Sequence, residues 1–386
     1  MIAPNRKIGI LGGGQLGMFS AIAARRLGYQ VTVWDPHADA TAGTWADTFI
    51  SAPFDDPKAL HAFLKESEAV TYEWENIPIR LVETLEETAP VRPGSRVLRL
   101  LQNRITEKRF LAERKFPVTP FRVIEEPKEL HRAIADLALP AVCKTATAGY
   151  DGHGQWRLNR MEDVFSLQES LRPRPTGWII EKWAPYMKEL SVILARDEAG
   201  AFRAYPVTEN QHEEGILRIC GVPADIDPVI SHKAVSLSAD VIAALDGIGV
   251  FCVEIFLMGD GNLLINEIAP RPHNSGHYSI DVATVSQFEH QVRVLCGLPL
   301  IEPRLLSPAA MVNIIGPEVN TVESPEQLDR LLSIPGARLY HYRKKGVKPG
   351  RKMGHVTLVH QDPHQAMERA RKVHSLLKQS STNPIC

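Results

Sequence analysis

Chemically active side chains are concentrated in one short stretch, NEIAPRPHNSGHYSID, at residues 266–281. It contains a carboxylate (Glu267), a guanidinium (Arg271) and two imidazoles (His273 and His277), and proline, glycine and asparagine stiffen the path between them. A surface loop does not need this chemistry, and a protein core does not tolerate it unpaired, because burying an unpaired charge is costly. The stretch therefore indicates a functional site.

A second carboxylate, Glu254, is predicted to face Glu267 across a β-hairpin. Asp260-Gly261 between two apolar runs is a strong signal for a two-residue turn, and this turn sets Glu254 opposite Glu267. Two carboxylates so placed repel each other unless a cation lies between them, and magnesium suits an all-oxygen site. The alternative is a solvated face that leaves both charges in water. Strand alternation points Asn266 to the other face, unless the strand already ends there.

The N-terminal segment GGGQLG places Gly12, Gly14 and Gly17 in GxGxxG spacing, after an apolar strand and at the start of a helix. Asp35 ends the next strand, as in a dinucleotide-binding fingerprint, where the helix N-terminus favours anions. Three interpretations stay open. The loop binds a nicotinamide or flavin dinucleotide, it binds the phosphate of another ligand, or it is a corner that needs glycine only for packing.

A second glycine-rich loop, in CKTATAGYDGHGQW, follows Lys144 and contains Gly149, Gly152 and Gly154. It lacks the GK[ST] pattern of a P-loop and joins strand to strand, so its backbone N–H groups are expected to close over phosphates while Lys144 neutralises charge. The alternative is a plain hairpin beside a surface lysine. The strand WIIEKWAP at 178–185 ends in a proline-limited linker, whose backbone groups are suited to a purine edge.

The elements that position these residues follow from the apolar pattern. Strand–helix alternation over the first hundred residues predicts a parallel, doubly wound α/β sheet. From about residue 140, strands predominate and indicate an antiparallel α+β region, with one clear helix in SHKAVSLSADVIAALDG. A single helix is expected over residues 96–115, and a third segment, also α+β, starts near Pro303.

Bulk composition limits the classes of function. The 386 residues suffice for two or three domains, and a hydrophobic content of 44% is typical of a globular protein. The net charge of −1 gives no long-range attraction to nucleic acids or anionic membranes, so neither is an expected partner. Five scattered cysteines without a CxxC pair favour reduced thiols over disulfides or a zinc site. The absence of a secretory signal or a membrane-length apolar run predicts a cytoplasmic protein.

Five motifs occur in order along the chain: GILGGGQLG, GYDGHGQW, PVTENQHEEGIL, NEIAPRPHNSGH and GRKMGHV. Together they resemble the 5-(carboxyamino)imidazole ribonucleotide synthetases of the ATP-grasp superfamily, from about residue 7 to about residue 360. The resemblance implies a Rossmann-like pre-ATP-grasp domain at residues 1–108, an ATP-grasp domain at 109–302 and a small C-terminal domain at 303–386. Within the ATP-grasp domain, it implies a small lid subdomain at 109–183 and a larger subdomain at 184–302.

The resemblance also implies an activity, the ATP-dependent carboxylation of 5-aminoimidazole ribonucleotide with bicarbonate through carboxyphosphate, in purine biosynthesis. ATP and Mg²⁺ would bind between two antiparallel sheets, with Glu254 and Glu267 as the metal ligands. The residues implied to contact ATP are Arg104, Lys144, Gly149, Tyr150, Asp151, Gly152, His153, Gly154, Gln155, Glu181, Lys182, Trp183, Ala184, Glu189, His212, Asn266 and Glu267.

The ribonucleotide and bicarbonate would occupy the cleft toward the N-terminal domain. The residues implied to bind them are Gln15, Leu16, Glu73, Tyr150, Arg271, His273, Asn274, Ser275, Lys345, Arg351 and Lys352, and those implied to act in catalysis are Asp151, His153, Arg271, His273 and Lys352. Glu73 and Glu75 share one face of a strand and are candidates to orient the substrate amine. The family usually carries Lys or Arg where this chain has His153, and LYHYRKKG leaves the phosphate contact open between Lys344 and Lys345.

Other functions remain as alternatives. The related formate-dependent phosphoribosylglycinamide formyltransferase shares the NE…PRPH theme, and it would require formate. An NAD-dependent oxidoreductase would use the first glycine loop but would not account for the carboxylate hairpin. A non-catalytic nucleotide-binding module would bind ATP without turnover. Relatives suggest a homodimer, by analogy.

Overall fold

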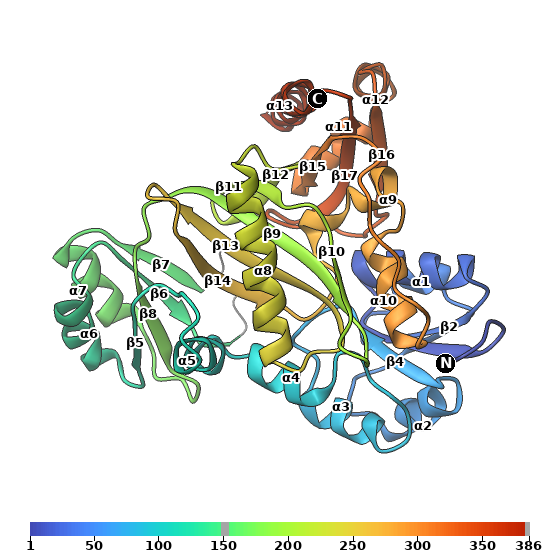
Figure 1. Ribbon diagram of the computed structural model, residues 1–386, viewed down its shortest axis with the longest axis horizontal. Coiled ribbons are helices and arrows are strands. Elements are labelled where there is room, and N and C mark those ends of the chain that lie inside the picture. The colour runs from blue at the N-terminus through green and yellow to red at the C-terminus, as the bar shows by residue number, and fades with distance from the viewer. Residues whose placement is uncertain (148–153, 383–386) are drawn as a thin grey trace.

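The computed structural model describes residues 1–147 and 154–382, and the strands in these ranges form three sheets (Figure 1). A small sheet lies at one end of the molecule, the N-terminal sheet and the C-terminal segment lie at the other, and a large sheet connects them (Figure 1). None of the helices in the described ranges is long and apolar enough to cross a membrane.

The N-terminal sheet is parallel, with the strand order β3-β2-β1-β4. One face, including Ile8 and Val33, packs against α1 and α10 (Gln287–Leu295), and the other, including Trp34 and Tyr72, packs against α2, α3 and α4. Helices on both faces confirm the predicted doubly wound arrangement. The elements are β1 (Lys7–Leu11), α1 (Gln15–Arg26), β2 (Gln30–Asp35), η1 (Thr41–Trp45), β3 (Thr48–Ser51), α2 (Pro57–Lys65), β4 (Ala69–Tyr72), α3 (Ile79–Glu86) and α4 (Ser95–Leu101).

The expectation of one helix over residues 96–115 is wrong, because the chain forms two helices there, α4 and α5 (Arg104–Glu113). Asn103 has an extended backbone conformation, and its side chain accepts a hydrogen bond from the N–H of Ile105, so it caps α5. The apolar spacing continues across this break and therefore did not reveal it. The break sets α5 as a separate element between the small and large sheets.

The small sheet is antiparallel, with the order β5-β8-β6-β7. One face packs against α6 and α7 through residues such as Cys143 and Ile180. Because side chains alternate along a strand, the neighbouring Lys144 and Glu181 point to the opposite face, toward α5. The elements are β5 (Phe121–Ile124), η2 (Pro127–Glu129), α6 (Leu130–Leu137), β6 (Ala141–Thr145), β7 (Gln155–Leu158), α7 (Met161–Ser170) and β8 (Trp178–Lys182).

The large sheet has the order β14-β13-β9-β11-β12-β15-β17-β16, and β10 pairs with β9. Helix α8 packs on it through Ala234, Val241 and Ile242. The sheet comprises β9 (Tyr186–Arg196), β10 (Phe202–Ala204), β11 (Thr208–Glu213), β12 (Ile216–Val222), β13 (Gly249–Met258), β14 (Leu263–Ala269), β15 (Ala309–Ile315), β16 (Ala337–His341) and β17 (Lys352–Val359). Its helices are α8 (Pro228–Ala244), η3 (Asn274–Gly276), α9 (Ser279–Val282), η4 (Gly316–Glu318), α11 (Val319–Glu323), α12 (Pro325–Leu332) and α13 (Pro363–Thr382).

The C-terminal strands continue this sheet, because β15 pairs with β12 through contacts such as Cys220 with Met311. The predicted boundary near residue 303 therefore separates strands of one sheet, and it stays a prediction.

Candidate active site

Strands β13 and β14 form the predicted hairpin, and Glu254 pairs with Glu267, but by a different route from the one expected. The N–H of Met258 donates to the carbonyl of Asn262 at 2.9 Å, so the turn has three residues rather than two. The pairing then shifts by one residue at a β-bulge, which leaves Asn266 as the extra residue of β14. The longer turn and the bulge offset each other, and the two glutamates face each other.

The bulge also brings Asn266 into the site. Strict alternation would have turned this side chain to the face opposite Glu267, but its Oδ1 lies 3.4 Å from the Nζ of Lys144. Asn266 and Glu267 thus present oxygen atoms to the same region. Asn266 was expected to join the site only if the strand ended there. The strand continues, and the bulge brings Asn266 into the site instead.

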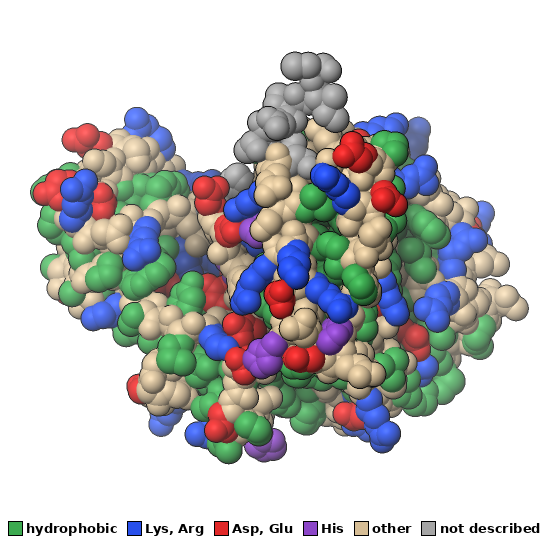
Figure 2. Space-filling model, turned by 90° about the horizontal axis from the view of Figure 1, so that it is seen from above, with side chains coloured by type: hydrophobic (Ala, Val, Ile, Leu, Met, Phe, Trp, Pro, Cys, Tyr) green, Lys and Arg blue, Asp and Glu red, His purple; other side chains and the backbone are tan. Residues whose placement is uncertain are grey.

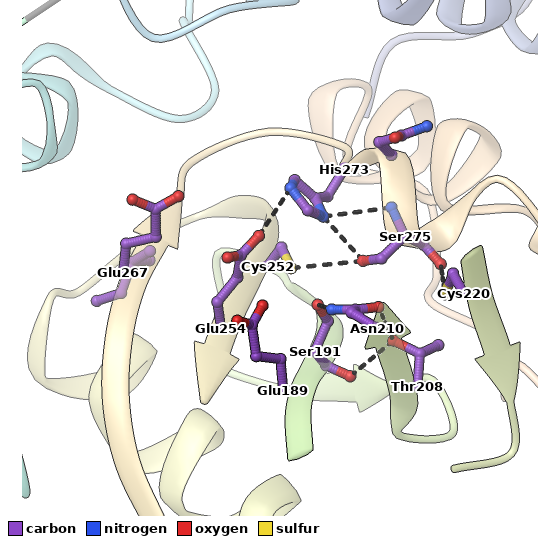
Figure 3. A network of polar contacts seen from close by, with 12 residues as sticks. Glu189, Ser191, Thr208, Asn210, Cys220, Cys252, Glu254, Glu267, His273 and Ser275 are labelled. Carbon is purple, nitrogen blue, oxygen red and sulfur yellow. Dashed lines mark hydrogen bonds and ion pairs between the residues drawn. The ribbon is translucent and has the colours of Figure 1, made fainter. Parts of the chain in front are cut away.

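Cationic side chains hold both carboxylates. Glu267 forms an ion pair with Arg104, and the Oε1 of Glu254 lies 3.0 Å from the Nε2 of His273 (Figure 3). Burial opposes the ionisation of Glu267, but the Arg104 guanidinium lowers its pKa to about 2. Burial likewise opposes a charge on His273, but Cys252 and Glu254 raise its pKa to about 10.

The oxygen atoms of Glu254, Glu267 and Asn266 are suitable ligands for Mg²⁺. Two facing carboxylates and a neighbouring amide oxygen form a hard, all-oxygen set of the kind that Mg²⁺ prefers. The residues therefore fit the ion, with Glu254 and Glu267 as ligands and Asn266 beside them.

Helix α5 clamps the outer edge of β14 around this bulge. The carboxylate of Glu107 accepts a hydrogen bond from the N–H of Ile268 at 2.6 Å, and Lys108 donates to the carbonyl of Ile265 at 3.2 Å. Together with Arg104, which pairs with Glu267, these side chains lie on one face of the helix at the i, i+3 and i+4 positions. Since β14 is an edge strand of the large sheet, side chains of α5 supply hydrogen-bond partners to its backbone. They fix the backbone on both sides of Glu267, the predicted metal ligand.

Lys144 belongs to a buried charge cluster. Its Nζ lies 2.8 Å from Oε2 of Glu181, and the Nζ of Lys108 lies 3.5 Å from Oε1 of the same carboxylate. All three side chains are at least nine-tenths buried. Burial opposes the charge on Glu181, but the two lysines lower its pKa to about 2. Glu181 therefore holds Lys144 in place, so any contact of Glu181 with adenine would involve its backbone.

The linker after β8 carries the other residues predicted to bind adenine. The N–H groups of Lys182 and Trp183 donate to the carbonyls of Pro120 and Pro140, and the Trp183 ring carries the guanidinium of Arg157 at 3.9 Å from its centre. Ala184 is buried.

On the paired strands β9 and β11 of the large sheet, Glu189 forms an ion pair with His212. Burial opposes both charges, but the pairing lowers the pKa of Glu189 and raises that of His212. Glu189 lies beside Glu254 (Figure 3), so the predicted ribose contact adjoins the predicted metal ligands.

The loop that follows β14 brings Arg271 and His273 into the site and also has buried side chains. The Nε of Arg271 lies 2.5 Å from Oε2 of Glu75, and His273 contacts the Oγ of Ser275 at 2.8 Å through Nδ1. The amide of Asn274 is paired with that of Asn313 on β15 at 2.6 Å and 3.1 Å. Asn274 and Ser275 are therefore buried supports of the loop.

His277, in contrast, lies apart from the polar site. It is fully buried among Phe19, Phe288, Tyr342 and His355, and burial lowers its pKa well below the usual value.

The first glycine loop already has anionic partners within the chain. The carboxylate of Glu73 accepts hydrogen bonds from the N–H groups of Gly14 and Gly17, at 2.5 Å and 2.8 Å. Asp35 accepts one from Gly13 at 2.7 Å. A dinucleotide pyrophosphate would use these donors, so the arrangement disfavours nicotinamide or flavin binding. Gln15, the first residue of α1, borders the loop, whereas the side chain of Leu16 is buried in the core.

Cations from the C-terminal segment approach the same region. Lys344 is close enough to act electrostatically on Glu73, whereas Lys345 is exposed. Arg351 donates to the carbonyls of Lys345 and Gly346 and so holds that loop, and Lys352 is half-buried at the start of β17. The structure therefore favours Lys344 over Lys345 as the lysine that faces the site.

Seen from above, acidic, basic and histidine side chains lie together near the centre of one face of the molecule (Figure 2).

Some predicted residues lie outside the described part of the chain, namely Gly149, Tyr150, Asp151, Gly152 and His153. Gly154 and Gln155 are described and border the site beside β6. The N–H of Thr145 donates to the carbonyl of Gly154 at 2.8 Å, and Gln155 pairs with Lys144.

Sequence reasoning missed three residues of the site, Glu107, Lys108 and Asn313, and it left Lys344 open as the alternative to Lys345. A signal existed for the first two, since Arg104, Glu107 and Lys108 are spaced i, i+3 and i+4 and so share one face of a helix.

Three family models match the sequence. They are the ribonucleotide synthetase preATP-grasp domain at residues 5–102, the ATP-grasp domain at 109–288 and the phosphoribosylaminoimidazole carboxylase C-terminal domain at 309–369. Together with the two antiparallel sheets and the facing carboxylates between them, these matches define an ATP-grasp protein.

Comparison with individual relatives shows to which family of ATP-grasp proteins this chain belongs. The N5-carboxyaminoimidazole ribonucleotide synthase of Bacillus subtilis (strain 168) is 41% identical over 364 residues, which are 94% of this chain and 93% of the relative. A crystal structure of the ADP complex of an N5-carboxyaminoimidazole ribonucleotide synthetase has a TM-score of 0.92 at 39% identity and covers 99% of both chains. The Aspergillus clavatus enzyme, in complex with ADP and 5-aminoimidazole ribonucleotide, has a TM-score of 0.89 at 31% identity, over 97% of this chain and 99% of its own. The chain belongs to the N5-carboxyaminoimidazole ribonucleotide synthase family.

Proposed function

We propose that this protein catalyses the ATP-dependent carboxylation of 5-aminoimidazole ribonucleotide, with bicarbonate as the source of the carboxyl group. The products are N5-carboxyaminoimidazole ribonucleotide, ADP and phosphate. The observation that carries the proposal is the facing pair Glu254 and Glu267, with the cations Arg104 and Lys144 beside it. Family membership and the ligands named in the related crystal structures support the choice of substrate.

The chemistry consists of two transfers. A bicarbonate oxygen takes the γ-phosphoryl group of ATP, which forms carboxyphosphate and releases ADP. The exocyclic amine of the ribonucleotide then bonds to the carboxyl carbon, either directly or after release of carbon dioxide, while phosphate leaves and the amine loses a proton. Phosphoryl transfer requires positioning and charge neutralisation rather than a protein nucleophile. When bound, Mg²⁺ would neutralise charge on the transferring phosphates.

The residues of the chain have distinct roles in this proposal. Lys144, oriented by Glu181, neutralises phosphate charge, and Arg104 can pass from Glu267 to a phosphate when the metal arrives. Glu189 and the linker at 181–184 hold the nucleoside, with His212 near the phosphates. Asp151 and His153 would belong to the loop that excludes water from carboxyphosphate.

The loop at 271–275 provides the bicarbonate and carboxyphosphate pocket. Arg271 contacts Glu75 of the N-terminal domain, and this contact supports a role for Arg271 between the two substrates. Glu73 contacts the ribonucleotide, and Lys344, Arg351 and Lys352 supply positive charge for its phosphate. We assign this protein to the cytoplasm and expect it to form a homodimer by analogy with its family.

A phosphate-release assay tests the function. The protein is incubated with Mg²⁺ and ATP, with and without 5-aminoimidazole ribonucleotide, and with either bicarbonate or formate. We expect release to be fastest with the ribonucleotide and bicarbonate together, and the carboxylated product to be detected by mass spectrometry. Glu267→Gln should lower the rate by at least about a hundredfold, since it removes one of two metal ligands. Phosphate release that needs formate, or no release under any combination, would overturn the proposal.

A further inference from the structure

A second set of metal-binding atoms adjoins the magnesium ligands, on the side away from Glu267. Cys252, Glu254 and His273 each direct one donor atom to a common point, and these three atoms all lie within 4.8 Å of one another. Cys252 and Glu254 are two residues apart on β13, so alternation puts them on the same face (Figure 3). His273 reaches them from the loop beyond β14.

The chemistry of this set differs from that of the magnesium site. A thiol, an imidazole and a carboxylate form the mixed sulfur, nitrogen and oxygen set that Zn²⁺ and similar transition metals prefer, whereas Mg²⁺ avoids sulfur. Ligand atoms around a tetrahedral zinc are about 3.5 Å apart, so the donors need to close by roughly 1.3 Å at most. Glu254 and His273 are already at 3.0 Å.

The surroundings also suit a bound metal. The Nδ1 of His273 accepts a hydrogen bond from the N–H of Ser275 at 3.3 Å and lies 2.8 Å from the Oγ of the same residue, so the ring is held with Nε2 toward the ion. The Sγ of Cys252 lies 3.9 Å from the same hydroxyl. Cys252 is fully buried, but Glu254 and His273 keep 14% and 16% of their side-chain surface exposed, which leaves a side for entry and for a water ligand.

We propose that Cys252, Glu254 and His273 form a binding site for Zn²⁺ or a similar transition-metal ion, and that this site excludes Mg²⁺ from its neighbouring position because both ions need Glu254. Binding releases the proton of the thiol and the proton that His273 shares with Glu254. The bound ion would therefore inhibit the enzyme by removing a magnesium ligand. This inhibition rests on the proposed function, whereas the binding itself does not.

Cobalt binding tests the site without reference to activity. The full-length protein is titrated with Co²⁺ alone, in a Cys386→Ser background, because that thiol lies outside the described residues. We expect one equivalent of Co²⁺ and a near-ultraviolet thiolate-to-cobalt absorption band. Cys252→Ala should abolish the band and weaken binding at least tenfold. Cys220→Ala is the matched control, since Cys220 is also buried, and its Sγ lies 3.2 Å from the carbonyl of Ser275. A wild-type protein without the band, or a Cys252→Ala protein that keeps it, overturns the proposal.

Zinc inhibition tests the consequence. We expect micromolar Zn²⁺ to inhibit phosphate release by the wild-type enzyme and excess Mg²⁺ to relieve it, while Cys252→Ala needs at least tenfold more Zn²⁺. Equal inhibition of both proteins would place the zinc on Glu254 and Glu267 and contradict the assignment of Cys252. Cys252→Ser, which keeps the size of the side chain, replaces Cys252→Ala if thermal melting shows that the alanine variant is unfolded. Should the protein have no carboxylation activity, the cobalt titration still decides whether the metal site exists.

Discussion

Replacement of Glu181 by glutamine removes the negative charge between two buried lysines. The carboxylate lies 2.8 Å from Lys144 and 3.5 Å from Lys108, and no more than 8% of any of the three side chains is exposed. In Glu181→Gln, two ammonium groups remain buried without their counter-charge. We expect this variant to be destabilised and to bind ATP weakly, because Lys144 loses the partner that orients it.

The magnitude follows from the pKa of Glu181. Burial raises this pKa, but Lys108 and Lys144 lower it from 4.5 to about 2. Since one pKa unit corresponds to about 1.36 kcal/mol, the charged form is stabilised by about 3 kcal/mol in the folded protein. Loss of one partner of a buried ion pair costs a similar amount, about 3–5 kcal/mol. The folded pKa is below the unfolded value, so this stabilisation is present above about pH 4.5 and is lost as the pH falls toward 2.

Urea unfolding, followed by circular dichroism, measures the effect. At pH 7.5 we expect Glu181→Gln to lose about 3 kcal/mol relative to the wild type, and the difference should shrink as the pH falls below 4.5. The added substitution Lys108→Met should restore part of the loss, because one uncompensated charge is removed with it. Asp136→Asn is the control, since it breaks an exposed pair with Arg122 in the same subdomain and should cost less than about 1 kcal/mol. A loss for Glu181→Gln as small as that of the control would refute the reasoning.

Three further predictions concern the helix clamp, the C-terminal lysines and a buried histidine. Glu107→Ala leaves the N–H of Ile268 without its acceptor, so the KM for Mg²⁺ should rise several-fold in a magnesium titration, whereas Glu107→Gln keeps an acceptor and should stay near the wild type. Lys344→Ala should raise the KM for 5-aminoimidazole ribonucleotide about tenfold in steady-state kinetics, and Lys345→Ala should leave it unchanged, because Lys344 acts electrostatically on Glu73 whereas Lys345 is exposed. Burial lowers the pKa of His355 to about 3, so below about pH 6.5 the unfolded chain takes up a proton that the folded protein does not. This costs about 2 kcal/mol at pH 5, and the urea midpoint of His355→Gln should fall less between pH 7 and pH 5 than that of the wild type.

The carboxylate pair shows what the sequence could predict and how. The apolar pattern and the Asp-Gly signal predicted a hairpin with Glu254 opposite Glu267, and the structure has this pairing. The predicted two-residue turn is wrong, since the chain forms a three-residue turn and compensates for it with a bulge at Asn266. This bulge has no glycine to mark it in the sequence, so the position of Asn266 depended on contacts that only the folded chain makes.

Long-range contacts account for most of what the sequence did not reveal. The parallel sheet and its two covered faces follow from short-range alternation, and they were predicted. The contact of Glu107 with Ile268 joins residues 161 positions apart, and that of Asn274 with Asn313 joins η3 to β15 across two predicted domains. Periodicity describes one element at a time, and therefore does not identify which charged side chain satisfies the backbone of another element.

The glycine loop at residues 12–17 has a consequence for how the N-terminal part of the molecule responds to ligands. Its backbone N–H groups donate hydrogen bonds to Glu73 and Asp35 of the same chain. The loop is therefore ordered without a bound phosphate. Amide hydrogens of Gly13, Gly14 and Gly17 should exchange slowly with solvent deuterium even in the empty protein, and at nearly the same rate after nucleotide is added. The loop is therefore a wall of the cleft that is already ordered without ligand, and it does not become rigid when a ligand binds.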